Sequence, residues 1–332
     1  MNRPTLEAVA ARAGVGRGTV SRVINGSPNV SEKAREAVRQ AIEELGYVPN
    51  RAARALVTRR TDTVALVVSE SELRVFDEPY FAGTIRGIGS ALSETGLQLI
   101  LAMAQSDEEH ERLEHYLTGQ HVDGVLLLSL HGDDPLPARL EAMGVPTVLG
   151  GRPVGPAPYS YVDMDNRAGA RQAVKHLLGL GRASIATIAG PQDMGVGVDR
   201  LAGYRDALLS SGMPELVAYG DFSEESGASA MRELLAGHPG LDAVFTASDL
   251  MAVGAMRVLK AAGRTIPGDV AVVGFEDSKA AAHTDPPLTT VHQPTEAMGR
   301  QMAQLLVARI NGEEVRQPVV ILDTHLVLRE SA

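Results

Sequence analysis

Apolar and polar positions follow two different rhythms along this chain of 332 residues. In the first 60 residues the apolar positions recur every three or four residues, which is the spacing of helices with one buried face. The spacing predicts three short helices, near 5–13, 17–24 and 31–45. Gly14 breaks the first helix and Gly46 ends the third.

From residue 61 onward, short apolar runs alternate with amphipathic stretches. Buried strands are predicted at 63–69, 97–103, 123–129, 145–150, 183–189, 242–247 and 269–275. Helices are predicted near 80–95, 107–118, 165–181, 197–211, 225–236, 249–262 and 294–310. Apolar strands alternating with helices indicate a parallel sheet covered on both faces. The alternation is interrupted near 159–165 and then resumes, so we expect two doubly wound lobes, with 283–293 as a crossover.

This reading divides the chain into an all-α head and an α/β body. We expect a helix-turn-helix domain at 1–48, a linker at 49–60 and two doubly wound parallel-sheet lobes of periplasmic-binding-protein type within 61–332. The first lobe is expected to hold about 61–161 and 294–320, and the second about 162–290 and 321–330.

Charge is divided unevenly between head and body. The net charge is −10, but residues 1–60 carry +6 and residues 61–332 carry −16. A basic head on an acidic body is expected when only the head meets a polyanion such as DNA. The alternative is a solvated basic tail, and the helical patterning of the head argues against it.

Composition excludes several other classes of protein. The chain has no cysteine, which excludes disulfides, thiolate zinc sites and cysteine nucleophiles. The N-terminus lacks the apolar stretch of a signal peptide, and no window is apolar enough to span a membrane, so we expect a cytoplasmic protein. No phosphate-binding loop or G-x-S-x-G motif occurs, and no metal or cofactor is expected.

Two short helices joined by a glycine turn form the helix-turn-helix pattern. The second helix would enter the major groove, where Arg17 and Arg22 could each pair two donors with guanine. The alternative is that both arginines are solvated surface charges. Thr19, Ser21 and Asn25 are better placed to contact phosphates. The expected DNA-binding set also includes Gly18 on the outer face of that helix, Thr5 and Asn50.

The segment TLEAVAARAGVGRGTVSRVINGSP, with its continuation to RAARAL, resembles the head of the LacI/GalR family of bacterial repressors. The resemblance continues in the body at GPQDMGVGVDRLAGYRDAL, FTASDLMAVGAMRVLK, DVAVVGFEDS and DPPLTTVHQP, so it covers nearly the whole chain. It implies a homodimeric repressor that binds a palindromic operator and responds to a small effector.

The resemblance also implies that 49–60 folds into a hinge helix on DNA. Leu56 stands where the family inserts a leucine wedge into the minor groove, and Arg51 and Arg54 would lie near phosphates. The chain departs from the family at Gly16, where serine is common. This leaves more of the base readout to Arg17 and Arg22 and favours a half-site that contains G·C pairs.

Two doubly wound lobes place their strand ends on either side of one cleft, where ligands bind. The resemblance implies small sugars or purines as effectors. The matching positions are Glu78, Tyr80, Phe81 and Arg152 in the first lobe, Arg200, Phe222, Ser248, Asp249 and Glu276 in the second, and Gln293 in the crossover. Acids and arginine suit sugar hydroxyls, and a flat aromatic suits the C–H face of a sugar.

Each of these positions has a structural alternative. Phe222 could be a core aromatic, Arg200 a partner in a structural ion pair, and Asp249 the cap of the helix that follows it. Tyr80 and Phe81 could simply fasten the next helix to the sheet.

Two glycines precede Arg152 where the family often has an aspartate, and they leave room for a disaccharide. Segments 14–28 and 119–137 look most like those of cello-oligosaccharide-responsive repressors. The expected effector is therefore cellobiose or a cello-oligosaccharide that induces; purine-type corepression is the alternative. A periplasmic sugar-binding protein would need an export signal. A sugar-modifying enzyme could use Asp249 and Glu276, but no nucleophile or activating base accompanies them.

Overall fold

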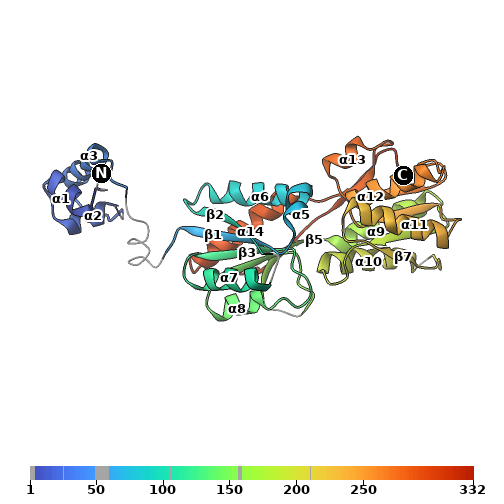
Figure 1. Cartoon of the computed structure of the whole chain (residues 1–332), viewed down its shortest axis with the longest axis horizontal. Coiled ribbons are helices and arrows are strands. Elements are labelled where there is room, and N and C mark those ends of the chain that lie inside the picture. The colour runs from blue at the N-terminus through green and yellow to red at the C-terminus, as the bar shows by residue number, and fades with distance from the viewer. Residues whose placement is uncertain (1–3, 25, 49–59, 105–106, 156–158, 210) are drawn as a thin grey trace. The chain divides into compact units, whose positions relative to one another are not determined.

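The computed structural model describes residues 4–24, 26–48, 60–104, 107–155, 159–209 and 211–332. The chain divides into two compact units, Met1–Thr61 and Asp62–Ala332, and each is described by itself. The larger unit contains two lobes, which can be found in Figure 1 by the labels of their helices and strands.

The small unit is built from three helices around one apolar core. These are α1 (Leu6–Ala13), α2 (Arg17–Ile24) and α3 (Glu32–Leu45). The Thr5 hydroxyl caps α1 by accepting from the Ala8 amide at 3.3 Å, and Gly14 ends the helix with a φ of +64°, which favours glycine. The core consists of buried Val9, Ala10, Val20, Val38, Ala41 and Tyr47. The predicted helix-turn-helix head is confirmed.

Lobe 1 contains a six-stranded parallel sheet in the order β11-β5-β4-β3-β1-β2. Its strands are β1 (Thr63–Val68), β2 (Gln98–Met103), β3 (Gly124–Leu128), β4 (Thr147–Gly150), β5 (Ser160–Met164) and β11 (Val319–Leu322). Its helices are α5 (Glu72–Asp77), α6 (Pro79–Leu92), α7 (Asp107–Thr118), α8 (Leu136–Ala142) and α14 (Thr295–Ile310).

Lobe 2 contains a second six-stranded sheet in the order β12-β10-β9-β8-β6-β7, with only the β10–β12 pair antiparallel. Its strands are β6 (Ile185–Ala189), β7 (Leu216–Tyr219), β8 (Ala243–Thr246), β9 (Ala271–Glu276), β10 (Thr289–His292) and β12 (His325–Val327). Its helices are α9 (Asn166–Gly179), α10 (Gly195–Leu208), α11 (Glu224–Gly237), α12 (Asp249–Ala261) and α13 (Lys279–His283).

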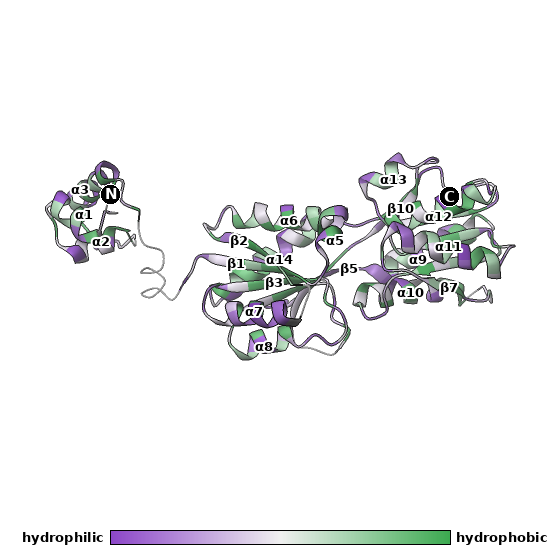
Figure 2. Cartoon of the chain, viewed as in Figure 1, coloured by the Kyte–Doolittle hydropathy of each residue, from purple (hydrophilic) through white to green (hydrophobic). Residues whose placement is uncertain are grey.

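Helices cover both faces of each sheet, as Figure 1 shows for lobe 1, with α6 and α14 on one face and α7 and α8 on the other. In lobe 2, α9 and α10 enclose one apolar cluster and α11 and α12 enclose the other. Figure 2 shows the apolar strands between helices that carry polar residues. The two doubly wound lobes expected from the sequence are confirmed.

The close packing of α6 on α14 depends on glycine. A Cβ on Gly87 would lie 2.1 Å from the Glu296 carbonyl oxygen, and one on Gly299 would lie 2.0 Å from the Thr84 carbonyl oxygen. No side chain fits at such distances, so these glycines let the two backbones approach.

The structure differs from the sequence reading mainly at short elements. The interruption near 159–165 is in fact strand β5, whose polar sequence SYVDM hides its burial between β4 and β11. Strands β7 and β11 are absent from the predicted strands; each has four residues and is only partly buried. The segment after β1, expected as a loop, contains the short helix α5, which Ser71 caps through the Arg74 amide.

Three crossovers join the lobes. The chain passes from β5 to α9, from β10 to α14 and from β11 to β12. Lobe 1 therefore takes α14 and β11 from the last forty residues of the chain. Because the strands are mostly parallel, the loops after the strands of both lobes border one cleft.

Candidate functional site

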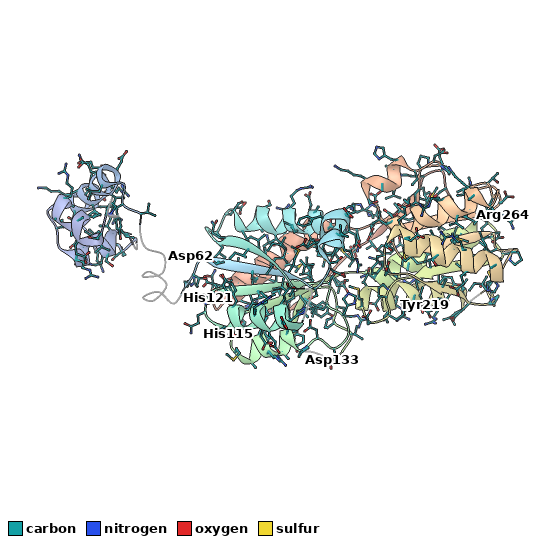
Figure 3. The ribbon with its side chains drawn as sticks, viewed as in Figure 1. Asp62, His115, His121, Asp133, Tyr219 and Arg264 are labelled. Atoms are coloured by element: carbon teal, nitrogen blue, oxygen red, sulfur yellow. The ribbon has the colours of Figure 1, made fainter. Side chains whose placement is uncertain are left out.

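The cleft between the lobes is deep and lined by polar and aromatic side chains. Its empty space, including the part open to solvent, is about 1130 Å³. Eight predicted effector positions line it: Glu78, Tyr80, Phe81, Arg152, Arg200, Phe222, Glu276 and Gln293. Asp133, labelled in Figure 3, also lines it. The structure therefore brings together residues that lie more than two hundred positions apart.

Arg200 lies at the centre of the cleft and is almost fully buried at 2% exposure. Its Nε donates to the Asn166 Oδ1 at 3.0 Å, and its Nη1 donates to the Ala247 carbonyl oxygen. The guanidinium lies 3.8 Å from the ring centroid of Phe275. Burial lowers the pKa of Arg200 to about 10, and neighbouring Glu276 and Asp163 oppose the shift. A buried cation is costly, so acidic neighbours are expected around it.

The acids of the cleft hold their protons more tightly than free carboxyls. Burial raises the pKa of Asp163 to about 6, while backbone amides of Met164 and Arg152 oppose the shift. Burial also raises the pKa of Glu276 to about 8, and the neighbouring Asp249 adds to it. Among the described residues, the buried side-chain oxygen of Gln293 has no hydrogen-bond partner. These groups can accept hydrogen bonds from a polyhydroxyl ligand.

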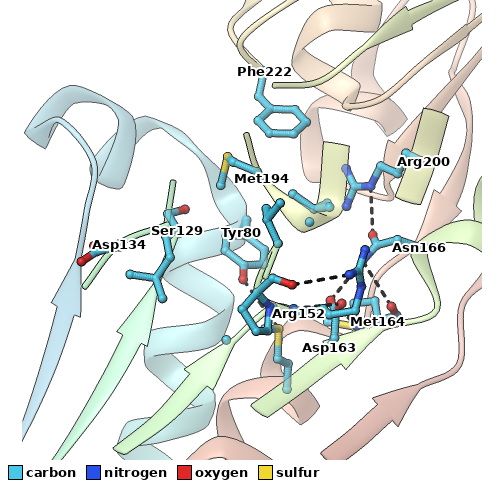
Figure 4. Close-up of a pocket in the computed structure, with 18 of the residues that line it drawn as sticks. Tyr80, Ser129, Asp134, Arg152, Asp163, Met164, Asn166, Met194, Arg200 and Phe222 are labelled. Atoms are coloured by element: carbon cyan, nitrogen blue, oxygen red, sulfur yellow. Dashed lines mark hydrogen bonds between the residues drawn. The ribbon is translucent and has the colours of Figure 1, made fainter. Parts of the chain in front are cut away.

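Aromatic rings lie on two sides of the cleft. Figure 4 shows Phe222 above Met194 and Tyr80, with Arg200 to their right. The Phe222 ring lies 5.4 Å from the Arg74 guanidinium and 5.9 Å from that of Arg200. Tyr80 and Phe81 meet edge to face at 5.2 Å, and Phe81 is buried in the lobe 1 core. Phe222 and Tyr80 can therefore offer an apolar face to a ligand.

Backbone conformations that favour glycine occur at three cleft residues. Ser129, Phe222 and Glu276 have φ angles of +56°, +73° and +121°. Strained backbone persists only where the surroundings hold it, and it clusters at functional sites.

Two arginines of lobe 1, Arg74 and Arg152, form ion pairs at the cleft edge, and the partner of Arg152 belongs to lobe 2. Arg74 donates from Nε to Glu78 Oε1 at 2.5 Å and from Nη1 to Glu70 Oε1 at 2.7 Å. Burial raises the pKa of Glu78, and Arg74 opposes that shift. Arg152 donates to both carboxylate oxygens of Asp199, from Nε at 3.0 Å and from Nη2 at 2.8 Å.

Ser248 and Asp249 lie outside the lining of the cleft. The Ser248 hydroxyl, and not Asp249, caps α12 by accepting from the Met251 amide at 3.2 Å. Asp249 is fully buried and accepts from the Thr290 hydroxyl at 2.6 Å and from the Ser278 amide at 2.7 Å. In this structure both residues hold the loops that carry Phe222 and Glu276.

Sequence reasoning missed Asp163, Asn166, Arg74 and Met194 as cleft residues. The polar run around Asp163 does not show the pattern of a strand, although it forms the end of β5. Had β5 been recognised, the rule that ligands bind beyond strand carboxyl ends would have singled out Asp163 and Asn166. Arg74 lies in the short helix α5, which carries no apolar repeat.

The head presents the expected polar surface on α2. Arg17, Gly18 and Arg22 are exposed. Arg17 pairs with Glu7 at 3.1 Å, and the Arg22 Nε donates to the Gly18 carbonyl oxygen at 3.2 Å, so neither arginine is fastened to the core. Thr19 and Ser21 are half-buried on the same helix. The expected contacts of Asn25, Asn50, Arg51, Arg54 and Leu56, and the hinge helix, lie outside the described residues.

Other kinds of site find no support where the structure is described. Across those residues, no three His, Asp or Glu side chains come close enough together to hold a metal ion. No helix within the described ranges is both long and apolar enough to cross a membrane.

Two protein families match parts of the chain. Residues 5–50 match the family described as bacterial regulatory proteins, lacI family, and residues 174–332 match the periplasmic binding protein-like domain. The HTH-type transcriptional regulator CelR of Thermobifida fusca is 63% identical over 99% of this chain and 98% of its own. The ribose operon repressor of Escherichia coli K12 is 35% identical over 99% of both chains.

Solved structures agree over the whole length. A transcriptional regulator CelR–cellobiose complex, 61% identical, aligns over 99% of this chain and 100% of its own with a TM-score of 0.80. The Lac repressor dimer bound to operator and the anti-inducer ONPF, 29% identical, aligns over 99% of both chains with a TM-score of 0.88.

Proposed function

The chain belongs to the LacI family of bacterial regulatory proteins, and we propose that it is a repressor controlled by a cello-oligosaccharide. It binds a palindromic operator as a homodimer, and cellobiose in the cleft between its lobes controls the operator affinity. Sugar binding lowers the operator affinity and releases the operator, so cellobiose acts as an inducer.

One observation carries the choice of sugar. The regulator that is 61% identical along the whole chain was solved with cellobiose, and the cleft of this chain has the chemistry that such a ligand needs. An arginine, two carboxyls and an unpartnered amide oxygen suit sugar hydroxyls, while Phe222 and Tyr80 suit the C–H faces of the rings.

Room for a second glycosyl unit is argued from Gly151. Its φ is +100°, and no atom lies within 4 Å of where a Cβ would stand. Gly150, in contrast, packs against Leu128 and Met302, where a side chain would clash. The cleft is therefore open beside Gly151, on the lobe 1 side that Tyr159 and Asp133 also line.

Operator reading belongs to α2 of the head. Arg17 and Arg22 point to solvent from one helix whose other face is anchored by buried Val20. A helix of this kind fits the major groove, and two heads related by a twofold axis read the two halves of a palindrome. Leu56 of each subunit is proposed to wedge the minor groove between the half-sites.

The cleft and the head communicate through lobe 1. Its first strand, β1, follows directly on the linker, and the same strand leads into α5 and α6 at the cleft. A ligand that favours one lobe arrangement therefore changes the spacing of the two linkers in a dimer, and with it the fit to the operator. The protein has no catalytic role and works in the cytoplasm, where the DNA lies.

Two measurements test this proposal. Calorimetry should show cellobiose binding, with maltose and galactose much weaker. A gel-shift selection from a palindrome library should return a specific duplex that cellobiose releases. Absence of heat with cellobiose removes the sugar assignment, and absence of any selected duplex at low salt removes the repressor assignment.

A further inference from the structure

The two lobes touch directly along one side of the cleft. The loops after β3 and β4 of lobe 1 meet the start of α10 in lobe 2. We call these the rim contacts and define them by His131, Gly132 and Arg152 on lobe 1 and Asp193, Gly195 and Asp199 on lobe 2.

The rim contacts of His131, Gly132 and Arg152 have the geometry of hydrogen bonds. The Gly132 amide donates to the Asp193 carbonyl oxygen at 2.8 Å, and the His131 Nδ1 lies 2.8 Å from the Asp193 Oδ2. Arg152 and Asp199 form a bidentate ion pair with N–O distances of 2.8 and 3.0 Å. Their side chains are 36% and 22% exposed, so water only partly weakens this pair.

Gly195 lets the lobes come this close. A Cβ at Gly195 would lie 2.2 Å from the Arg152 carbonyl oxygen, which belongs to the other lobe. The three atoms nearest to that position all belong to Arg152, so a side chain there would push the two lobes apart at the rim.

The rim contacts are joined to the ligand-binding residues. Asp199 directly precedes Arg200 on α10, and the Arg152 amide donates to the Asp163 Oδ2 at 3.1 Å. The rim contacts are therefore linked directly to Arg200 of lobe 2 and Asp163 of lobe 1, which both line the cleft.

We propose that the rim contacts hold the cleft closed around its ligand, and that His131 makes closure stronger at lower pH. These residues position the two lobes relative to each other at the border of the cleft. The inference rests on the proposed function only for the sugar used as a probe.

The pH dependence follows from the surroundings of His131. Its Nε2 lies 3.2 Å from the Glu70 Oε1, while its Nδ1 faces Asp193. A neutral imidazole can donate to only one of these carboxylates, whereas a protonated one donates to both. The hydrogen bond to Glu70, followed by that to Asp193, raises the pKa of His131 above its usual value, against the opposing effect of burial.

Opening the cleft takes Asp193 away from His131 and leaves Glu70 in lobe 1. The pKa of His131 is then higher in the closed form than in the open form, so closure takes up a proton. Closure is favoured as the pH falls through the closed-form pKa and weakened as the pH rises. Arg74 of α5 acts on the same carboxylate, because its Nη1 donates to the Glu70 Oε1 at 2.7 Å.

Hydrogen exchange of the full-length, sugar-free protein tests closure directly. The Gly132 amide reports it, because its acceptor lies in the other lobe. After correction for intrinsic rates, a peptide covering residues 129–135 should exchange more slowly at pH 6.5 than at pH 8. Asp199→Asn and Gly195→Ala should accelerate its exchange, and His131→Gln should remove the pH difference.

A matched control is available on the same helix. Asp206 of α10 also forms a bidentate ion pair, with Arg167 at 2.6 and 2.8 Å. Both partners of this pair belong to lobe 2. Asp206→Asn should leave the exchange of residues 129–135 unchanged. If Asp199→Asn and Gly195→Ala behave like Asp206→Asn, the rim contacts do not hold the cleft closed.

Calorimetry with cellobiose gives the second readout. Asp199→Asn should weaken binding about tenfold, as expected for loss of a charge-assisted hydrogen bond. His131→Gln should weaken it at pH 6.5 more than at pH 8, although Asp163 and Glu276 still titrate in both proteins. If hydrogen exchange behaves as expected but cellobiose gives no heat, the proposed sugar is rejected and the role of the rim contacts stands. If Asp199→Asn binds cellobiose with unchanged affinity, the role of the rim contacts is rejected.

Discussion

A single buried cation organises the cleft at the scale of residues. Arg200 is enclosed by aromatic rings and fastened to Asn166, and the carboxyls around it are held partly protonated. Removing one partner of such an arrangement leaves a buried charge without compensation. The residues of the cleft therefore act as a set, and single changes are expected to alter ligand affinity more than the fold.

Phe222 provides the first test of this set. Phe222→Ala should weaken cellobiose binding at least about tenfold, because it removes the aromatic face that covers the sugar C–H groups. Operator affinity without sugar should be unchanged. Phe222→Leu keeps an apolar side chain without a flat face, so its cellobiose affinity should lie between those of the unsubstituted protein and Phe222→Ala. Calorimetry and gel shift measure both effects; normal affinity in both variants would make Phe222 a core residue only.

Arg22 provides the corresponding test in the head. Arg22→Ala should lower operator affinity by about 1–3 kcal/mol and relax one base position, because a guanidinium that pairs with guanine is lost. Arg39→Ala removes another exposed charge, from α3, and is the control. Selection from a randomised half-site compares the three proteins. An unchanged base preference in Arg22→Ala would contradict its role in readout.

The raised pKa of Glu276 makes stability depend on pH. An unfolded glutamate has a pKa near 4.5, whereas burial raises the pKa of Glu276 in the folded protein to about 8. The folded state thus binds more protons between these values, and the free energy of unfolding falls as the pH rises through this window. Thermal unfolding of ligand-free protein from pH 6 to 9 should show the fall, and Glu276→Gln should flatten it. An equally steep profile in Glu276→Gln would contradict this assignment.

At the scale of elements, apolar strands that are buried on both faces were predictable from sequence, even at four residues, whereas the polar or partly exposed strands β5, β7 and β11 were not. The segments that form β1, β3 and β9 are continuous apolar runs of five or six residues, which favour buried strands. Strand β5 was missed because its sequence SYVDM contains polar residues, among them Asp163 of the cleft, and therefore lacks a continuous apolar run. The position of Asn166, Arg74 and Met194 in the cleft depends on how the lobes meet, which no local pattern records.

The α6–α14 packing yields a prediction for elements. Gly87→Ala should destabilise lobe 1 by about 1–3 kcal/mol, because its Cβ would collide with the α14 backbone. Gly89 lies on the same helix, and no atom lies within 4 Å of where its Cβ would stand. Gly89→Ala should instead stabilise the helix by about 0.5–1 kcal/mol. Thermal unfolding compares the two, and an equal effect in both variants would contradict the packing argument.

At the scale of the whole molecule, charge separates the two tasks. The head carries +6 and the body −16, so attraction to DNA is confined to the head, while the body is repelled by phosphate. This separation was readable from sequence, because it requires only a count along the chain.

Salt should therefore weaken operator binding steeply. If six to ten phosphates are neutralised per dimer, affinity should fall roughly 10³–10⁵-fold between about 50 and 200 mM salt. Fluorescence anisotropy of a labelled operator measures the slope, with cellobiose affinity in the same buffers as the control. A shallow slope, below about two ions released, would contradict binding through the basic head.

The order of the chain has a consequence for synthesis on the ribosome. Helix α6 is made early, but α14, which covers it, follows only about two hundred residues later. At ordinary translation speeds this delay is roughly 10–40 s, during which an apolar helix face of lobe 1 waits uncovered. A nascent chain cut short before Thr295 completes neither lobe, so truncated products should go to proteolysis and leave no half-finished sensor in the cell.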